Sequence, residues 1–306
     1  MLSQPQDLEI LLFDDCGNDG SLAIAQAYAA RYPDRIRVFA GEQNLGAGAR
    51  RDEGIRAALG EYLTFADADD TLPPGYFDSL TAPLAGGARP DLIAAGHLLI
   101  RKGRSKAVIP DPSDPSDPWM HPGCWGKLYR TAYLREKNID FRGCRVYEDG
   151  LFLYRLLASR PETVILPEAL YRYELNDDSV TRKKSRSRIR LFPVYAAEIL
   201  DLAREISVLP EDREILVYCL ACQLTVNLLY NGQGGGLSRM RRCVAIYEKT
   251  LREAVPDIVG NRYVSLRIPR GEPLLEKLAA FTILKLRPVG AHRLLLGLVS
   301  VLPKIR

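Results

Sequence analysis

The alternation of strand-like and helix-like patterns in the first 66 residues is the strongest constraint on the fold. Short apolar runs at 8–15, 36–40 and 61–66 alternate with segments of helical periodicity at 21–32 and 46–59. Alternating strands and helices, with strands that are apolar on both faces, indicate a parallel sheet covered by helices. Such sheets bind ligands at the carboxyl ends of their strands. We therefore expect an α/β fold with its site along that edge.

Two acidic stretches fall at this edge. Asp14-Asp15 ends the first predicted strand, and Asp67-Ala68-Asp69-Asp70 follows the third. Carboxylates this close repel one another, so they are either solvated or share a cation. Hard divalent cations take carboxylate oxygens and hold a substrate diphosphate with one or two protein carboxylates plus water. A solvated turn is the alternative, and the second acidic stretch favours the metal. The first stretch is placed to accept hydrogen bonds from a nucleobase or ribose.

Two helix beginnings add candidate residues. Gly46 and Gly48 precede a predicted helix that carries Arg50 and Arg51, and this arrangement suits a phosphate, although an ordinary surface helix explains it as well. Glu148 and Asp149 begin another predicted helix. A carboxylate there can serve as a general base, or it can simply interact with the helix dipole.

The second half of the chain is organised differently. From about residue 185 the periodicity is helical, so we expect a boundary near residue 183 that separates a domain at 1–183 from a helical domain at 184–306. The six cysteines are scattered and no secretory signal is recognisable, which indicates a reducing, cytoplasmic setting. No uninterrupted apolar run reaches the roughly 18 residues of a membrane span.

The motifs together resemble those of the family 2 glycosyltransferases, over residues 3 to 182. The matching stretches, in the family's order, are LEILLFDDCGNDGS, NLGAGARRDEGI, GEYLTFADADD, CWGKLYRTAYL, EDGLF and LYRYELNDDSVT. The resemblance implies a Rossmann-like GT-A fold: a mostly parallel sheet with helices on both faces, followed by an α-helical C-terminal region. The family's usual first strand and helix have no counterpart before this match. We therefore expect either a start further upstream or an N-terminally truncated product.

The family's functional residues carry over to matching positions. On the donor side the resemblance implies Asp14 and Asp15 for the nucleoside, Arg51 for the nucleotide or diphosphate, Asp67 and Asp69 for Mn²⁺ or Mg²⁺, and Asp70 in support of that pair. On the acceptor side it implies Asp149 as catalytic base with Glu148 beside it, Trp125 and Lys127 lining the acceptor site, and Ser179, Thr181 and Arg182 on a loop over the diphosphate. The implied reaction is one inverting displacement, in which Asp149 deprotonates the attacking hydroxyl.

The implied function is transfer of a hexosyl or N-acetylhexosaminyl group from a nucleotide-sugar, expected to be a UDP-sugar, to a surface or lipid-linked glycan in polysaccharide biosynthesis. The alternative is a catalytically inactive, truncated protein that serves as a binding or structural partner. Residues 261–306 hold nine Lys or Arg and two Glu, which suits peripheral contact with the inner face of a membrane. Nucleic acid is not an expected partner, because the basic residues lack interleaved aromatic residues.

Overall fold

The computed structural model describes residues 2, 7–121, 123–145, 147–175, 188–205, 210–233, 236–267 and 274–301, and it divides into two compact units. The first unit comprises Met1–Pro112, Gly123–Phe152 and Arg160–Asn176; the second comprises Ser113–Pro122, Leu153–Ser159 and Asp177–Arg306. The boundary near residue 183 stays a prediction. Two earlier segments, 113–122 and 153–159, have their contacts in the helical unit.

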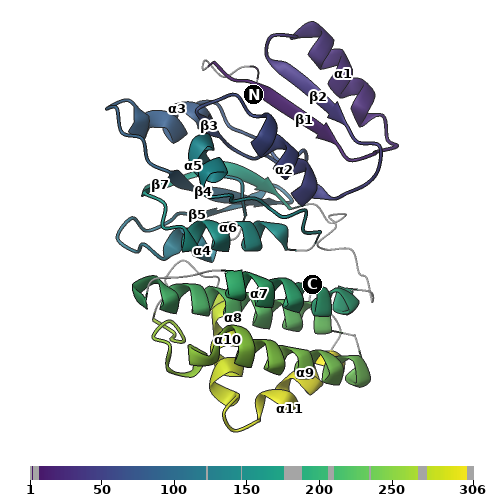
Figure 1. Ribbon diagram of the computed structural model, residues 1–306, viewed down its shortest axis with the longest axis vertical. Coiled ribbons are helices and arrows are strands. Elements are labelled where there is room, and N and C mark those ends of the chain that lie inside the picture. Colours follow the sequence, from purple (N-terminus) through teal and green to yellow (C-terminus); the bar gives the residue numbers. More distant parts are fainter. Residues whose placement is uncertain are drawn as a thin grey trace. The chain divides into compact units, whose positions relative to one another are not determined.

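The first unit begins with a β-α-β arrangement. Strands β1 (Ile10–Asp14) and β2 (Ile36–Ala40) pair in parallel, and helix α1 (Ser21–Arg31) connects them and contacts both (Figure 1). The rings of Phe13 and Phe39 stack between the two strands with their centroids 4.6 Å apart. The pattern predicted this arrangement because apolar strands need a covering helix to bury them.

The remaining strands form a mixed sheet in the order β3-β6-β4-β5, with β7 pairing with β4. Strand β4 is parallel to β7 and antiparallel to β5 and β6. The strands are β3 (Tyr62–Leu63), β4 (Leu92–Arg101), β5 (Arg104–Val108), β6 (Lys127–Arg130) and β7 (Thr163–Glu174).

The third predicted strand, at 61–66, is mostly not a ladder strand. Only two residues of it form β3, which pairs antiparallel with β6. Beyond β3, Phe65 forms an isolated parallel bridge with Trp125, and its ring packs edge-on against Phe141 and Phe152, at centroid distances of 5.3 and 5.9 Å. The sheet is therefore mixed where we expected mostly parallel pairing, while the α/β class itself is confirmed.

Helices cover this unit. They are α2 (Ala47–Ala57), α3 (Tyr76–Thr81), α5 (Thr131–Glu136) and the start of α6 (Glu148–Ala158), whereas α4 (Asp117–Met120) belongs to the second unit. The core lies where α3 packs on the mixed sheet: Tyr76, Phe77 and Leu80 lie against Ile93 and Leu128. The mixed sheet is thus packed against a layer of buried, mostly apolar side chains.

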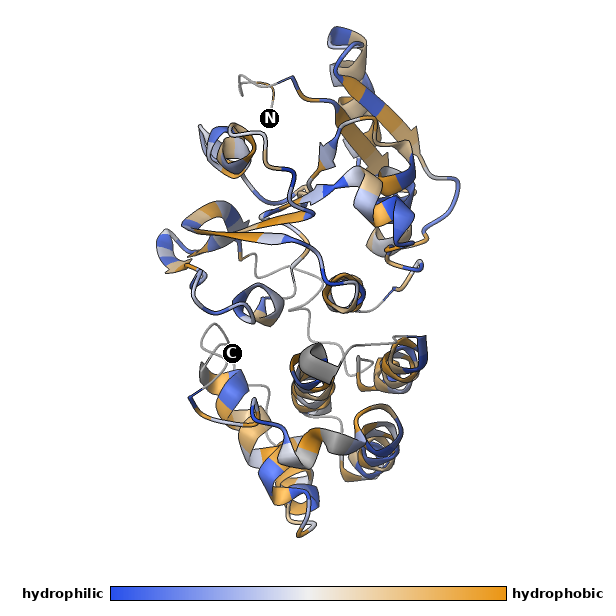
Figure 2. Ribbon diagram, turned by 60° about the vertical axis from the view of Figure 1, so that its left-hand side comes forward, coloured by the Kyte–Doolittle hydropathy of each residue, from blue (hydrophilic) through white to orange (hydrophobic). Residues whose placement is uncertain are grey.

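The second unit is helical, as expected. Its main helices are α7 (Phe192–Glu205), α8 (Pro210–Gly232), α9 (Leu237–Ala254), α10 (Leu274–Leu286) and α11 (His292–Val301). Helix α8 contacts the other four, and polar and apolar residues occupy different sides of these helices (Figure 2). The segment Arg213–Gly232 of α8 is long and apolar enough to cross a membrane, but 78% of it is buried within the protein, as expected of a core helix.

One buried carboxylate ties α2 to the segment that precedes α6. Asp52 is 6% exposed, and it accepts hydrogen bonds from the backbone N–H of Phe141 (2.6 Å) and of Gly143 (2.8 Å). A side chain of the neighbouring position in α2 can therefore reach the first residues of α6.

The replacement Asp52→Ala removes both acceptors of the N–H groups of Phe141, which is buried, and Gly143, which is half-buried. We expect the free energy of unfolding of this unit to fall by about 2–4 kcal/mol. Urea denaturation followed by circular dichroism measures the change. Asp34→Ala, which removes an exposed carboxylate, is the matched control and should change stability by less than about 0.5 kcal/mol. Equal effects of the two replacements would contradict a structural role for Asp52.

Candidate active site

Arg51 lies at the centre of an acidic cluster in the first unit. Its Nη2 donates to Asp67 Oδ1 at 2.7 Å, and its Nη1 donates to Glu148 Oε1 at 3.0 Å and to Asp149 Oδ1 at 2.6 Å. The side chain is 14% exposed, and its guanidinium group lies over the ring of Phe141, 5.5 Å from the centroid. One cation thus joins three carboxylates from two motifs that are about 80 residues apart in the chain.

Close backbone packing makes this contact possible. A Cβ atom added to Gly48, in the first turn of α2, would lie 2.5 Å from the carbonyl oxygen of Cys144 and 3.3 Å from the Cβ of Glu148. Such contacts are too short for any residue but glycine, so Gly48 permits α2 to approach the start of α6. We expected Gly48 to admit a phosphate; here it admits the protein's own backbone.

Asp149 has the environment of a general base. Burial raises the pKa of Asp149 to about 6, although Arg51 favours its charged form. The thiol of Cys124 hydrogen-bonds this carboxylate, and burial raises the pKa of Cys124 itself. A carboxylate with a pKa near 6 is charged at neutral pH and is more basic than an ordinary aspartate, as a proton acceptor needs to be.

The acidic turn at 67–70 is held by β7. The hydroxyl of Tyr171 accepts a hydrogen bond from the N–H of Asp67 (3.1 Å) and donates to Asp70 Oδ2 (2.6 Å). The other Asp70 oxygen accepts from the N–H of Glu174 at 2.8 Å. Burial raises the pKa of Asp70 to about 6. Both oxygens of Asp70 are therefore used within the protein, in agreement with a supporting role beside the proposed metal ligands.

Asp67 and Asp69 fit a divalent cation that brings further ligands with it. Among the described residues, Asp69 is exposed with no hydrogen-bond partner for its carboxylate, and Asp67 uses one oxygen for Arg51. No group of three or more His, Cys, Asp or Glu side chains in the described part of the chain is arranged as a complete metal site. Two carboxylates with free oxygens suit Mg²⁺ or Mn²⁺ that also binds diphosphate oxygens and water.

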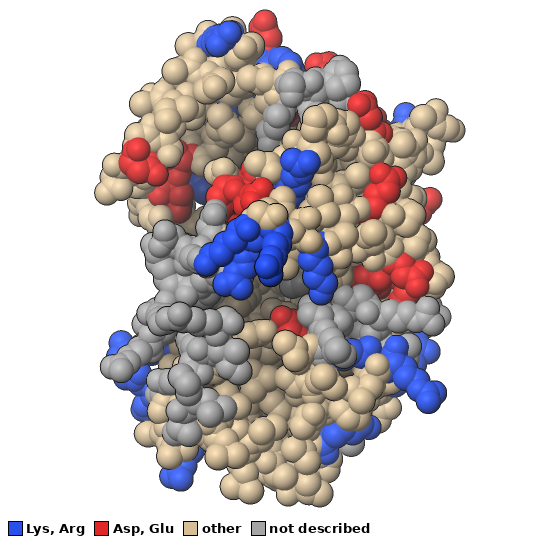
Figure 3. All heavy atoms as spheres, turned by 180° about the vertical axis from the view of Figure 1, so that it is seen from behind, with Lys and Arg blue, Asp and Glu red and all other residues tan. Residues whose placement is uncertain are grey.

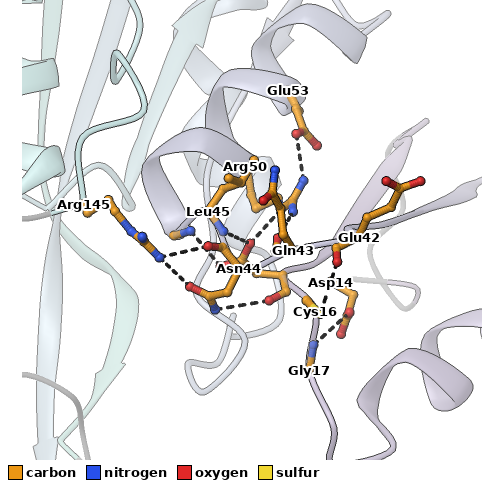
Figure 4. Close-up of polar contacts among 12 residues, drawn as sticks. Asp14, Cys16, Gly17, Glu42, Gln43, Asn44, Leu45, Arg50, Glu53 and Arg145 are labelled. Carbon is orange, nitrogen blue, oxygen red and sulfur yellow. Dashed lines mark hydrogen bonds and ion pairs between the residues drawn. The ribbon is translucent and has the colours of Figure 1, made fainter.

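Asp14 and Asp15 differ in how many hydrogen bonds their carboxylates accept. Figure 4 labels Asp14 together with Leu45 and Arg50, two of the residues that bind Asp15. Asp15 Oδ1 accepts hydrogen bonds from the N–H of Leu45 (2.8 Å) and from Arg50 Nε (2.9 Å), and its Oδ2 accepts from the N–H of Gly46 (2.8 Å). Burial alone would raise the pKa of Asp15, but these hydrogen bonds lower it overall. The start of α2 therefore binds the carboxylate of Asp15, where the sequence suggested a phosphate.

Asp14 has capacity left for a ligand. Its Oδ2 accepts a hydrogen bond from the N–H of Gly17 at 3.1 Å, and its other oxygen has no partner among the described residues. Of the two carboxylates predicted to hold the nucleoside, Asp14 is the one whose geometry leaves an acceptor open.

The predicted acceptor-side residues are largely enclosed. Trp125 stacks on Tyr171 and Tyr173, with centroids 4.7 and 5.1 Å apart. Lys127 is 3% exposed and donates from Nζ to the carbonyl oxygen of Gly123 at 2.8 Å; burial lowers its pKa to about 8. Lys127 lies close enough to Asp149 for their charges to interact. The other predicted loop residues, Ser179, Thr181 and Arg182, lie outside the described residues.

Two residues of the site were not among the predicted ones. Tyr171 and Cys124 bind the acidic turn and the candidate base, and both lie within stretches that match the family, LYRYELNDDSVT and CWGKLYRTAYL. Arg50, which the sequence suggested for a phosphate, pairs with the carboxylates of Asp15 and Glu53 instead. Its guanidinium group lies over Gly41, where an added Cβ would be 2.0 Å from Arg50 Nη2.

Comparisons with known proteins identify the family of the chain and its fold. Over 185 residues the chain is 28% identical to the minor teichoic acid biosynthesis protein GgaB of Bacillus subtilis, a match that covers 56% of this chain and 20% of GgaB. The chain spans 20 to 60% of the length of the first three curated relatives that it matches.

Two solved structures share the fold. TarS 1–349 of S. aureus, solved in complex with UDP-GlcNAc, aligns with a TM-score of 0.69 at 18% identity, covering 94% of this chain and 85% of that one. The mannosyltransferase PcManGT of Pyrobaculum calidifontis, solved with GDP-Man and Mn²⁺, aligns with a TM-score of 0.52 at 15% identity over 97% and 78%. Residues 1–155 match the family described as glycosyl transferase family 2, and the chain belongs to this family.

Proposed function

We propose that the protein is a metal-dependent, inverting glycosyltransferase that moves a hexosyl or N-acetylhexosaminyl group from a nucleotide-sugar to a hydroxyl of a glycan. The ion pairs of Arg51 with both Asp67 and Asp149 carry this proposal. They hold a candidate metal ligand and a candidate base on one guanidinium group, so the leaving diphosphate and the attacking hydroxyl would meet within a few ångströms. Such positioning is a major source of catalytic rate.

The donor side follows from the carboxylates. Asp14 has an acceptor oxygen for a nucleobase or ribose, and Asp67 and Asp69 would hold Mn²⁺ or Mg²⁺. When bound, the metal would neutralise charge on the departing diphosphate. Two neighbours in fold were solved with UDP-GlcNAc and with GDP-Man and Mn²⁺, which supports a nucleotide-sugar donor. We propose a UDP-sugar.

The acceptor side centres on Asp149. Its carboxylate would take the proton of the acceptor hydroxyl, which attacks the anomeric carbon from the face opposite the leaving group. Glu148, beside it on Arg51, raises the pKa of Asp149 by like-charge repulsion. Cys124 orients the carboxylate through its thiol hydrogen bond. We also keep Ser179, Thr181 and Arg182 as the proposed loop over the diphosphate.

We propose a surface or lipid-linked glycan as the acceptor, and the inner face of a membrane as the place of transfer. One relative is described as a teichoic acid biosynthesis protein, which supports such an acceptor. The helical unit offers apolar side chains for peripheral contact: Leu294 and Leu298 lie one turn apart on α11 and are 76% and 63% exposed, and Arg293 beside them is exposed.

Calorimetric titration with UDP and with GDP, each with and without Mn²⁺, tests the donor site. We expect binding of UDP that requires Mn²⁺ and is lost in Asp69→Ala, because one carboxylate is too few for a diphosphate-bound metal. Asp34→Ala, an exposed carboxylate elsewhere, should bind as the wild type does. Metal-independent binding, or equal binding by Asp69→Ala, would refute the proposed metal pair.

The replacement Tyr171→Phe removes the hydroxyl that bridges Asp67 and Asp70. We expect Mn²⁺-dependent UDP binding to weaken by about tenfold, the value of one well-placed hydrogen bond. The same titration measures it. Tyr28→Phe removes an exposed hydroxyl on α1 and should have no effect. If both variants bind UDP equally well, the acidic turn does not depend on β7.

The pH dependence of turnover tests the base. Because Asp149 must be deprotonated to accept a proton, kcat/KM should fall as the pH decreases below about 6. Glu148→Gln removes a negative charge that raises the pKa of Asp149, so the acidic limb should move to lower pH. Release of UDP from a UDP-sugar, followed from pH 4.5 to 8, measures both profiles. An unchanged limb in Glu148→Gln, or full activity in Asp149→Asn, would exclude Asp149 as the base.

A further inference from the structure

The turn between β4 and β5 carries four cations in six residues. Arg101 ends β4, Lys102 and Gly103 form the turn, and Arg104 and Lys106 lie on β5, all of them exposed. Lys102 and Gly103 have positive φ angles of 49° and 75°, as a tight two-residue hairpin turn requires. We call residues 101–106 the basic hairpin. Neither the motifs nor the proposed mechanism accounts for it.

Three of these cations share one face of the sheet. Arg101 lies opposite Arg104, and Leu99 lies opposite Lys106. Residues directly opposite each other in a ladder point to the same face, as do residues two apart in a strand. Arg101, Arg104 and Lys106 therefore form one row on one face.

That face also carries the aromatic residues of the predicted acceptor side. On the other neighbour of β4, Tyr171 pairs with His97 and Tyr173 pairs with Leu99, so both tyrosines lie on the face of the basic row. Trp125 stacks on both tyrosine rings, and His97 meets it edge-on at 4.8 Å. The row of cations therefore lies on the same face of the sheet as this aromatic cluster.

The hairpin lies beside the acidic turn, but not within it. Thr71 forms a bridge with Arg172 of β7, and the neighbouring strand position on β4 is Leu98. Adjacent strands are about 4.8 Å apart, so the backbone of β4 is roughly 10 Å, and that of β5 roughly 15 Å, from the acidic turn. A diphosphate bound to a metal on Asp67 and Asp69 would be too far away to contact Arg104 and Lys106. An extended acceptor chain would be long enough to contact both cations.

The number of cations in the basic hairpin exceeds what strand protection needs. Arg104 lies directly opposite Arg101, so two like charges share one ladder position. A single lysine is enough to protect an edge strand such as β5 from pairing with another chain. Figure 3 shows basic side chains gathered on one face of the protein next to a group of acidic ones. An anion bound at Arg104 and Lys106 would meet two cations on one face of the sheet.

We infer that the basic hairpin binds the acceptor, and that the acceptor is an anionic glycan with phosphate or carboxylate groups along its chain. This inference rests on the proposed function, because it places the acceptor's reactive hydroxyl at Asp149. The anionic groups lie on Arg104 and Lys106, sugar rings lie toward Trp125, and the chain end reaches the acidic cluster. The hairpin selects the acceptor and takes no part in the chemistry.

Fluorescence anisotropy with labelled oligomers tests this inference. The probes are a glycerol phosphate hexamer, a galacturonate hexamer and a neutral dextran hexamer. The variant R104Q/K106Q is compared with R241Q/R242Q, which removes two exposed cations from α9 in the other unit. We expect the wild type to bind one of the two anionic oligomers, and R104Q/K106Q to bind it roughly five- to thirty-fold more weakly, the effect of two exposed charge pairs. R241Q/R242Q should bind like the wild type.

The melting temperature and the binding of UDP distinguish a binding role of the basic hairpin from a structural role. Since Arg104 and Lys106 are exposed, R104Q/K106Q should leave the melting temperature unchanged. UDP and Mn²⁺ titrated into the same proteins report separately on the proposed function, and R104Q/K106Q should bind them normally. Equal weakening in both double variants would overturn the inference. So would equal binding of dextran, or hairpin-dependent binding to phosphatidylglycerol vesicles without binding to either anionic oligomer.

Discussion

The ion pairs of Arg51 are the interaction on which the site depends. Asp67, Glu148 and Asp149 approach one another closely enough to repel, and the guanidinium group between them supplies the opposite charge. A fork with several donors can bind carboxylates from different segments at once, which a lysine ammonium does with less geometric definition. The same group keeps Asp149 from becoming fully protonated despite burial. Arg51 therefore sets both the position and the charge of the reactive groups.

Several features elsewhere in the first unit serve this contact. Gly48 lets α2 approach α6, and Asp52 fixes the segment between them through two backbone hydrogen bonds. Tyr171 holds the acidic turn from the opposite side, where it is stacked on Trp125. The side chain of Tyr171 thus contacts both the acidic turn of the candidate donor side and Trp125 of the candidate acceptor side.

The sequence predicted much of this and missed some of it, for identifiable reasons. Periodicity and motif order predicted the β-α-β start, the helical second half and the positions of the acidic stretches, because these depend on local pattern. The predicted parallel pairing of the third strand was wrong, because β3 pairs antiparallel with β6, a strand from a distant segment that local pattern does not identify. The carboxylate of Asp15 is bound by the start of α2, a contact between segments 30 residues apart that no local pattern encodes. The motifs include Tyr171, but its hydrogen bonds to the acidic turn and the shared face of the basic hairpin follow only from strand pairing.

A crystal structure with UDP and Mn²⁺ would test the central claim most directly. The account predicts Mn²⁺ on Asp69 and the free oxygen of Asp67, with the guanidinium group of Arg51 still hydrogen-bonded to Asp67 and Asp149. It also predicts that Asp70 remains bound to Tyr171. A structure in which Arg51 leaves Asp149 to bind the diphosphate, or in which the cation binds away from Asp67 and Asp69, would contradict it.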